Sequence, residues 1–266
     1  MNRCSRTALA LFLATLFVGA CDESTEGPPI QAPAEDVITE VIELPDQPVN
    51  LSFEGVLANG PTTSYTTNGT QFDVTLLGVY LVIGNVTVLS AGDPVPSFEP
   101  NSGERDPLGV GIRSLPGYQI VNLLTGTTLD TLEVAAGRAG PIYFGNVEAD
   151  GSTAPLAGEE WVPEIGHARY LLKARIVVGE LLDKTVEVSI PGDELMVLGA
   201  PAFDSTKSNT IRLQYDLDGW FQDVDIATLS HTSNTIYINA NENAAAYAII
   251  AGRMLESLAT PTIVWE

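Results

Sequence analysis

The sequence is poor in cysteine, histidine and basic residues, and each shortage argues against a class of function. Two cysteines and two histidines stand among 266 residues, so one chain cannot build a zinc or copper site from several histidines. Twelve basic residues against 34 acidic ones give a formal net charge of −22. A surface of that sign repels phosphate backbones, so the charge argues against a nucleic-acid partner.

Sequence motifs of catalysis are also missing. There is no Gly-x-Ser-x-Gly elbow, no CxxC pair, no glycine-rich phosphate loop and no heptad pattern. A serine–histidine–aspartate triad would have to use His167 or His231, and both fall in loop-like stretches. Glu159 and Glu160 would point in opposite directions on a strand, which disfavours a glycosidase-like carboxylate pair. We therefore expect a protein that is not an enzyme and needs no cofactor.

The first 20 residues have the three zones of a secretory signal. Arg3 and Arg6 form the basic start, an apolar stretch runs from Ala8 to Val18, and the small residues Gly19 and Ala20 follow. The apolar stretch of 11 residues is shorter than the roughly 20 that a membrane-spanning helix requires. We predict a removable signal peptide at residues 1–20.

Val18-Gly19-Ala20-Cys21 resembles a bacterial lipobox, in which an aliphatic residue and two small ones precede an acylated cysteine. Cleavage removes Cys4 and leaves Cys21 without a partner for an internal disulfide, and a thioether to diacylglycerol explains this single thiol. Several acyl chains on one residue give stable anchoring. The resemblance implies that lipid on Cys21 holds the protein in the bacterial cell envelope, on the periplasmic or outer side of a membrane.

The mature chain divides into a tether at residues 21–47 and a folded domain at residues 48–266. Between Asp22 and Asp46 there are eight acidic residues, no basic residue and several prolines. This composition cannot build an apolar core and predicts an extended, self-repelling linker. The domain after it is long enough for a sizeable core.

Short β-prone runs separated by glycine, proline, asparagine and aspartate dominate the domain and predict an all-β fold. In Ala168–Val178 and Thr210–Leu217 apolar residues alternate with polar ones, which is typical of antiparallel sheets with one buried face. We expect an antiparallel β-sandwich of about ten strands, with the following candidates: Val49–Val56, Gln71–Leu77, Val79–Leu89, Tyr118–Leu124, Pro141–Val147, Ala168–Val178, Lys184–Ile190, Glu194–Leu198, Thr210–Leu217, Thr235–Asn239 and Thr262–Trp265.

Two further patterns qualify this all-β expectation. Val79–Leu89 is apolar on both faces and should be a central, covered strand, with Val86 on the face of Tyr80 and Val82. Near the C-terminus, Ala244 to Leu258 is predicted to be a helix that Asn241 or Asn243 caps. A short helical turn is expected at Asp223–Leu229.

The segment Gln71–Val86, followed by Val121–Leu124 and by Ala136-Gly137 ahead of the strand with Ile142 and Phe144, resembles periplasmic lipoproteins of the methanobactin-partner type. These residues cover about a third of the chain. The resemblance implies a sandwich fold and a periplasmic compartment. The paired-cysteine motif of that family is absent, so neither copper binding nor any site residue is transferred.

Acidic and aromatic residues supply the candidate sites of the domain. Carboxylates beside Gly219 offer the hard oxygens that calcium prefers, although their spacing departs from an EF-hand loop. Exposed tryptophans can stack on carbohydrate rings. The candidate calcium ligands are Asp216, Asp218, Asp223 and Asp225, and the candidate ligand-binding residues are Trp161 and Trp220.

Arg169, Lys173 and Arg175 share one face of a predicted strand and would either hold an anion or pair with carboxylates such as Glu187 or Asp216. The long loops Ala91–Gly117 and Ala149–Gly166 are expected to present the recognition surface. The sequence thus favours a non-catalytic binding or structural lipoprotein, with an envelope protein or carbohydrate as partner. A calcium- or copper-binding protein, a carbohydrate-binding domain and a hydrolase that uses Asp223 or Asp225 stay as alternatives.

Overall fold

The structure, a computed structural model, describes residues 46–90, 113–129, 131–135, 139–149, 153–155, 165–198, 210–231 and 233–265. All of these belong to one unit between Glu43 and Glu266. The predicted signal peptide and Cys21 lie outside the described residues. The first strand begins at Asp46, so it includes the last two residues that we assigned to the tether.

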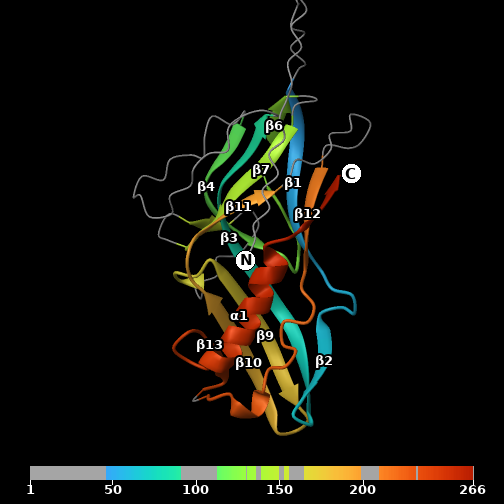
Figure 1. Ribbon diagram of the computed structural model, residues 1–266, viewed down its shortest axis with the longest axis vertical. Coiled ribbons are helices and arrows are strands. Elements are labelled where there is room, and N and C mark those ends of the chain that lie inside the picture. The colour runs from blue at the N-terminus through green and yellow to red at the C-terminus, as the bar shows by residue number, and fades with distance from the viewer. Residues whose placement is uncertain are drawn as a thin grey trace, which may run out of the picture. The chain divides into compact units, whose positions relative to one another are not determined.

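The described strands form two sheets (Figure 1). In the five-stranded sheet, β1 (Asp46–Val56) pairs in parallel with β12 (Thr210–Asp216) and antiparallel with β5 (Thr127–Thr128) and β6 (Leu132–Ala135). Strand β14 (Thr262–Trp265) adds to the other side of β12. Since β12 pairs with both β1 and β14, the first and last described strands belong to the same sheet and are separated by β12 alone.

The nine-stranded sheet is built around β3 (Thr70–Ser90), the longest strand of the described chain. It pairs with β2, β4, β7 and β9, and β13 lies parallel to β10. The bounds of the other members are Thr62–Thr67 (β2), Arg113–Asn122 (β4), Ala139–Asn146 (β7), Ala154–Pro155 (β8), Tyr170–Val178 (β9), Leu182–Ile190 (β10), Glu194–Leu198 (β11) and Thr235–Ile238 (β13).

Strand β3 keeps one face buried from Phe72 to Val86 because two irregularities change its alternation. Phe72, Val74 and Leu76 face the main core, and after a register shift between Leu76 and Gly78 the odd-numbered Val79, Leu81 and Ile83 take over. A second shift, between Gly84 and Val86, returns Val86 to the same core. A bulge adds one residue and so reverses which side chains point inward. Our assignment of Val86 to the face of Val82 was therefore wrong, and the strands predicted on either side of Gly78 are one.

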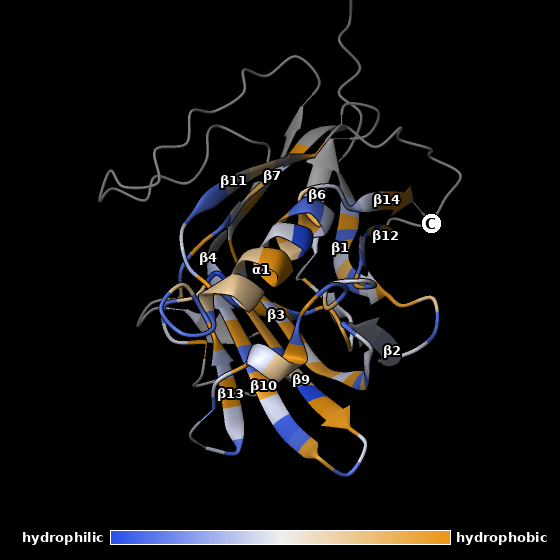
Figure 2. Cartoon of the chain, turned by 60° about the horizontal axis from the view of Figure 1, so that its bottom comes forward, coloured by the Kyte–Doolittle hydropathy of each residue, from blue (hydrophilic) through white to orange (hydrophobic). Residues whose placement is uncertain are grey.

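Apolar side chains fill two clusters, one on each face of the nine-stranded sheet. The larger lies between the sheets and contains Phe53, Leu81 and Leu213, which are all at most 1% exposed. The smaller includes Val82, Ile120 and Leu171 on the other face. Figure 2 shows the resulting alternation of apolar and polar residues along β9 and β10. The prediction that Val79–Leu89 is covered on both faces is confirmed from Val79 to Val86, where the structure describes the burial of the side chains other than Asn85.

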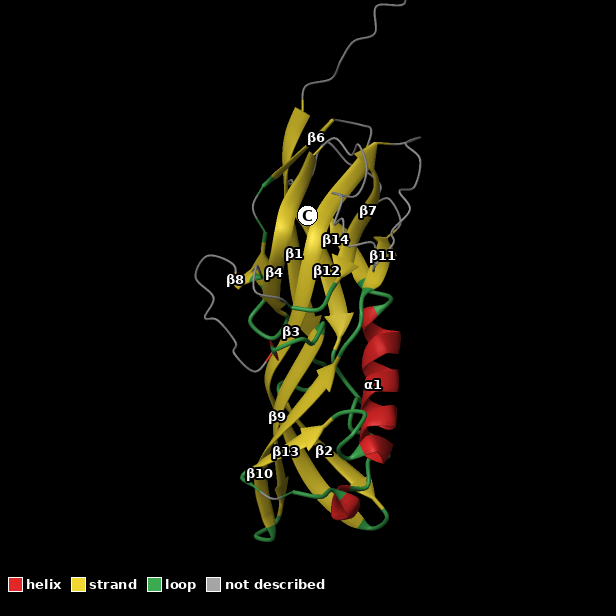
Figure 3. Ribbon diagram, turned by 90° about the vertical axis from the view of Figure 1, so that its left-hand side faces the viewer, coloured by secondary structure: helices red, strands yellow, loops and turns green. Residues whose placement is uncertain are grey.

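Helix α1 (Ala244–Leu258) has the predicted bounds and contacts β12 of one sheet and β10 and β13 of the other. Figure 3 shows it running beside the strands. Ile250, Met254 and Leu258 are fully buried on its inner face. Asn243 occupies the N-cap position, but its side chain bonds Ser230 and the Tyr237 carbonyl instead of the first turn of the helix.

The fold class predicted from the sequence, a β-sandwich with a C-terminal helix, is confirmed. The predicted helical turn is a single 3-10 turn, η2 (Ile226–Thr228), which the Asp225 side chain caps. Two features differ from the expectation. First, three strand pairs are parallel, namely β1 with β12, β10 with β13, and β4 with β8. Second, the sequence did not predict the polar or short strands β2, β5, β6 and β8.

Candidate functional site

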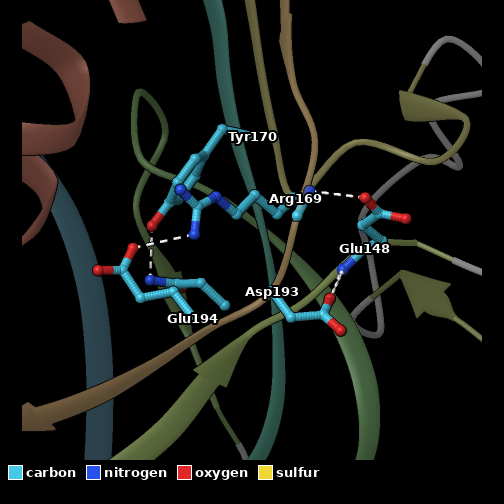
Figure 4. Close-up of polar contacts among 7 residues, drawn as sticks. Glu148, Arg169, Tyr170, Asp193 and Glu194 are labelled. Atoms are coloured by element: carbon cyan, nitrogen blue, oxygen red, sulfur yellow. Dashed lines mark hydrogen bonds and ion pairs between the residues drawn. The ribbon is translucent and has the colours of Figure 1, made fainter. Parts of the chain in front are cut away.

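A polar network joins residues at the end of β7 and at the starts of β9 and β11 (Figure 4). Arg169, immediately before β9, donates from Nη1 to Glu194 Oε2 at 2.9 Å, and its guanidinium carbon is 5.0 Å from the centre of the Tyr170 ring. The Tyr170 hydroxyl accepts a hydrogen bond of 2.6 Å from Asn146 Nδ2. Arg169, Tyr170 and Asn146 are buried, whereas the Glu194 side chain is 44% exposed. We call these four residues the Arg169 network.

Burial sets the electrostatics of this region. It raises the pKa of the Tyr170 phenol well above its ordinary value of 10.0, while Arg169 opposes this shift. Burial likewise raises the pKa of Tyr215, which stands on β12 of the facing sheet. Asn146 Oδ1, Arg169 Nε and the Tyr215 hydroxyl have no hydrogen-bond partner among the described residues. Buried polar groups thus stand on both sheets inside an otherwise apolar core.

A second set of contacts fixes the turn between β10 and β11 beside this network. The Glu148 amide donates to Asp193 Oδ1 at 2.8 Å, and the Gly192 amide donates to Glu148 Oε1 at 2.6 Å (Figure 4). Each carboxylate accepts a backbone N–H of the other segment. These acids therefore hold the end of β7 against the turn.

The predicted anion-binding face is instead occupied by ion pairs. Arg175 donates to both carboxylate oxygens of Asp183, at 2.7 and 2.6 Å, and this bonding lowers the pKa of Asp183 from its ordinary value. The strand register places Lys173 opposite Glu187, as expected. Asp216 cannot serve as the alternative partner because β12 belongs to the other sheet.

The four aspartates predicted to bind calcium do not form one group. Asp216 Oδ1 accepts from the Asp218 amide, Asp218 Oδ2 accepts from the Ala58 amide, Asp223 pairs with Arg253 at 2.6 Å, and Asp225 Oδ2 accepts from the Asn68 side chain. In the part of the chain that the structure describes, no three acidic, histidine or cysteine side chains are grouped to hold a metal ion. The sequence places these residues close together, but the turns after β12 direct their carboxylates to different partners.

Trp220 is not an exposed stacking platform, because its side chain is buried and only 1% of the residue is accessible. Its indole belongs to the main core, and its Nε1 has no hydrogen-bond partner among the described residues. Trp161 lies outside the described residues. His167 and His231 are both exposed, in keeping with ordinary loop histidines.

Trp220 nevertheless lines an open pocket of about 660 Å³ between the end of β12 and the last turns of α1. The pocket joins two parts of the chain that are far apart in sequence. We call it the α1 pocket, and its residues are Asp216, Asp218, Gly219, Trp220, Gln222, Arg253, Glu256, Ser257 and Thr260.

Local structure explains why these side chains converge. The chain turns sharply after β12 through Gly219, whose φ of 78° suits glycine. Arg253 of α1 donates from Nη1 to the Gly219 carbonyl at 2.8 Å and from Nη2 to Asp223. The Ser257 hydroxyl donates to the Asp216 carbonyl. The helix thus holds the turn, and both together form the pocket wall.

Sequence reasoning found Asp216, Asp218 and Trp220 but missed Arg253, Glu256 and Ser257. The outer face of a helix looks like an ordinary solvated surface in sequence, and only tertiary packing places it against the turn. The expected recognition loops fall mostly outside the described residues. Their described parts include the start of β4, the short strand β8, and residues 165–166.

The comparisons with known proteins assign no family to the chain, since no protein-family model and no curated protein matches it. Among solved structures, MbnP from Methylosinus trichosporium is similar at 11% sequence identity and a TM-score of 0.40. The similarity covers 72% of this chain and 83% of that chain. At this identity and TM-score, the likeness assigns neither a site nor a function.

Proposed function

We propose that this protein is a lipid-anchored binding module of the bacterial cell envelope, which holds its ligand in the α1 pocket without transforming it. The observation that carries the proposal is the pocket itself. Its volume of about 660 Å³ falls within the range of roughly 300–1,000 Å³ that is usual for small-molecule sites. The anchor and the compartment rest on the lipobox-like sequence around Cys21 and on the resemblance to methanobactin-partner-type lipoproteins.

The bonding of the pocket residues favours binding over catalysis. The Ser257 hydroxyl is engaged with a backbone carbonyl, and Arg253 is engaged with Gly219 and Asp223. A hydrolase that uses Asp223 or Asp225 would need one of these carboxylates to approach a substrate. Asp223 is instead ion-paired, and Asp225 caps η2 through its Ala227 contact.

A site-specific photo-crosslinker tests the pocket in cells. Gln222 lines the pocket and is exposed, so a photoreactive amino acid there should capture the ligand as a defined adduct. Glu180, in the exposed turn between β9 and β10, is the matched control position. We expect adducts at residue 222 that are absent at residue 180. Equal labelling at both positions, or labelling at neither, contradicts the assignment of the pocket.

The anchor is tested separately by mass spectrometry of the native protein. We expect a mature chain that begins at Cys21 and carries acyl chains, and a Cys21→Ser variant that leaves the membrane fraction. No helix in the described part of the chain has the length and apolarity needed to cross a bilayer. An intact leader, or an unmodified thiol on a native protein, would refute lipid anchoring.

A further inference from the structure

Strand β13 forms an edge of the nine-stranded sheet, since β10 is the only described strand that pairs with it. In a parallel pair, successive residues turn their backbone N–H and C=O groups alternately toward the neighbouring strand and away from it. The Thr185 amide of β10 donates to the Asn234 carbonyl at 3.3 Å, so Asn234 and Ile236 face β10. Thr235 and Tyr237 therefore direct their backbone groups to the outer edge of the sheet.

The composition of β13 does not protect this edge. Exposed N–H and C=O groups at a sheet edge are a template for an added strand, and proteins commonly block it with a charged residue or a proline. Strand β13 has the sequence Thr-Ile-Tyr-Ile, which contains neither, and Tyr237 is 44% exposed. Neutral, β-prone sequences pair readily with further strands. Any protection of the edge has to come from residues outside the strand.

Two side chains that flank β13 in sequence occupy its outer edge. The Ser233 hydroxyl accepts from the Thr235 amide at 3.2 Å and donates to the Thr235 carbonyl at 2.8 Å. The Asn243 side chain donates from Nδ2 to the Tyr237 carbonyl at 2.7 Å. Both backbone groups that an added strand would bind at Thr235, and the carbonyl at Tyr237, are thus already bonded within the chain.

Asn243 serves this edge instead of the helix that it precedes. An asparagine at an N-cap position ordinarily accepts from an amide in the first turn, but the Asn243 side chain makes no such bond. Its Oδ1 accepts from the Ser230 amide at 2.8 Å while its Nδ2 reaches β13. Its φ of 57° is one that glycine and asparagine tolerate best. The backbone and the side chain of Asn243 are therefore both arranged around the edge of β13.

We propose that Ser233 and Asn243 cap the outer edge of β13 and so prevent a second copy of this chain from adding its own β13 to the sheet. A second copy is the partner that this edge fits, because β13 carries no charge within a chain whose formal net charge is −22. A basic or acidic segment finds no complementary charge on the strand, whereas two identical neutral strands can pair antiparallel about a two-fold axis. The capped edge thus keeps the sandwich monomeric without a charged residue in β13.

Sedimentation velocity of the mature chain with Cys21→Ser, the parent chain, tests the capped edge. The uncapped variant combines Ser233→Ala with Asn243→Gly, because glycine keeps the positive φ while the side chain is removed. We expect a monomeric parent chain. The uncapped variant should dimerise with a dissociation constant at least about tenfold lower than that of the parent chain, which corresponds to about 1.4 kcal/mol.

Asn241→Gly is the matched control for the uncapped variant. It makes the same substitution in the same turn, and the Asn241 side chain has no hydrogen-bond partner among the described residues. This variant should stay monomeric.

A reversal variant locates the association at β13. Tyr237→Lys places a lysine opposite Glu187 of β10, so the change suits the folded chain. When two copies of β13 pair, the same change brings two like charges to the shared edge. Added to the uncapped variant, Tyr237→Lys should restore the monomer. Circular dichroism and thermal melting establish that each variant is folded.

The inference fails if the folded uncapped variant stays monomeric, if Tyr237→Lys does not reverse its association, or if Asn241→Gly associates equally. A parent chain that already dimerises, and that Tyr237→Lys returns to the monomer, contradicts it as well. If the uncapped variant does not fold, Ser233→Ala alone decides, because it removes only one hydroxyl. A dimer of Ser233→Ala that Tyr237→Lys reverses supports the capped edge, and a monomer at every concentration refutes it.

Discussion

Two tyrosines in the sandwich couple its stability to alkaline pH. Tyr170 and Tyr215 are each 1% exposed, and burial raises both pKa values above the ordinary 10.0 of an unfolded chain. Above pH 10 the unfolded chain loses protons that the folded chain keeps. The stabilisation is thus complete below pH 10 and is lost as the pH rises towards the folded-state pKa values.

We predict that the free energy of unfolding falls above pH 10 by about 1.4 kcal/mol per pH unit for each of these tyrosines. Urea titrations between pH 8 and 11 measure it. The Tyr170→Phe/Tyr215→Phe double variant lacks both phenols. Its free energy of unfolding should therefore fall less steeply above pH 10, by about twice 1.4 kcal/mol per pH unit. An unchanged slope in this variant would mean that other groups cause the alkaline sensitivity.

At the scale of single elements, the bulges of β3 decide which of its side chains face the core. Leu77 is the extra residue between Leu76 and Gly78, and the residue is 50% exposed. We predict that Leu77→Ser costs less than about 1 kcal/mol because little apolar contact is lost. Deletion of Leu77 should prevent folding, because it turns Val79, Leu81 and Ile83 away from the core.

Circular dichroism and denaturant titration distinguish these two variants. The substitution serves as the control for the deletion, since both remove the same side chain. A deletion variant with normal stability would show that β3 can shift its bulge elsewhere.

Helix α1 offers two neighbouring positions with opposite expected effects. Met254 is fully buried, so Met254→Ala should lower the free energy of unfolding by about 2–5 kcal/mol. Gly252 is exposed, and an added methyl group meets nothing within 4 Å. Gly252→Ala should therefore stabilise the protein by about 0.5–1 kcal/mol through helix propensity. Thermal and urea unfolding measure both, and the same sign for the two variants would contradict the packing described.

The elements that could be predicted from the sequence are those in which the spacing of apolar residues matches the set of residues that the fold buries. Helix α1 and strands β11 and β14 have their predicted bounds. Strand β2 was missed because Thr62–Thr67 has no fully buried residue and depends on pairing with β3. Its signal was the Asn68-Gly69 turn, in which both residues have positive φ, as in a tight hairpin.

The parallel strand pairs and the α1 pocket could not be predicted in the same way. Alternation in β1 and β12 indicates one buried face for each strand but does not give their relative direction. Trp220 was predicted to contact ligand through an exposed ring, whereas its position in the core leaves it as part of a pocket wall. Contacts between residues far apart in sequence decide both features.

The whole molecule carries strong self-repulsion. With a formal net charge of −22, added salt should screen repulsion between carboxylates more than it weakens the few ion pairs. We predict that raising sodium chloride from about 20 to about 500 mM, which shortens the Debye length about fivefold, raises the melting temperature by roughly 2–4 °C. Differential scanning calorimetry measures it, and a falling melting temperature would mean that exposed pairs such as Arg175–Asp183 dominate.

The parallel pairing of β1 with β12 has a consequence for the order of events during synthesis. Asn50 is matched with Thr210, so the first described strand lacks its parallel partner until most of the polypeptide has left the ribosome, although β5 and β6 are made earlier. Completion of the five-stranded sheet is thus postponed until the C-terminal strands β12 and β14 have been synthesised.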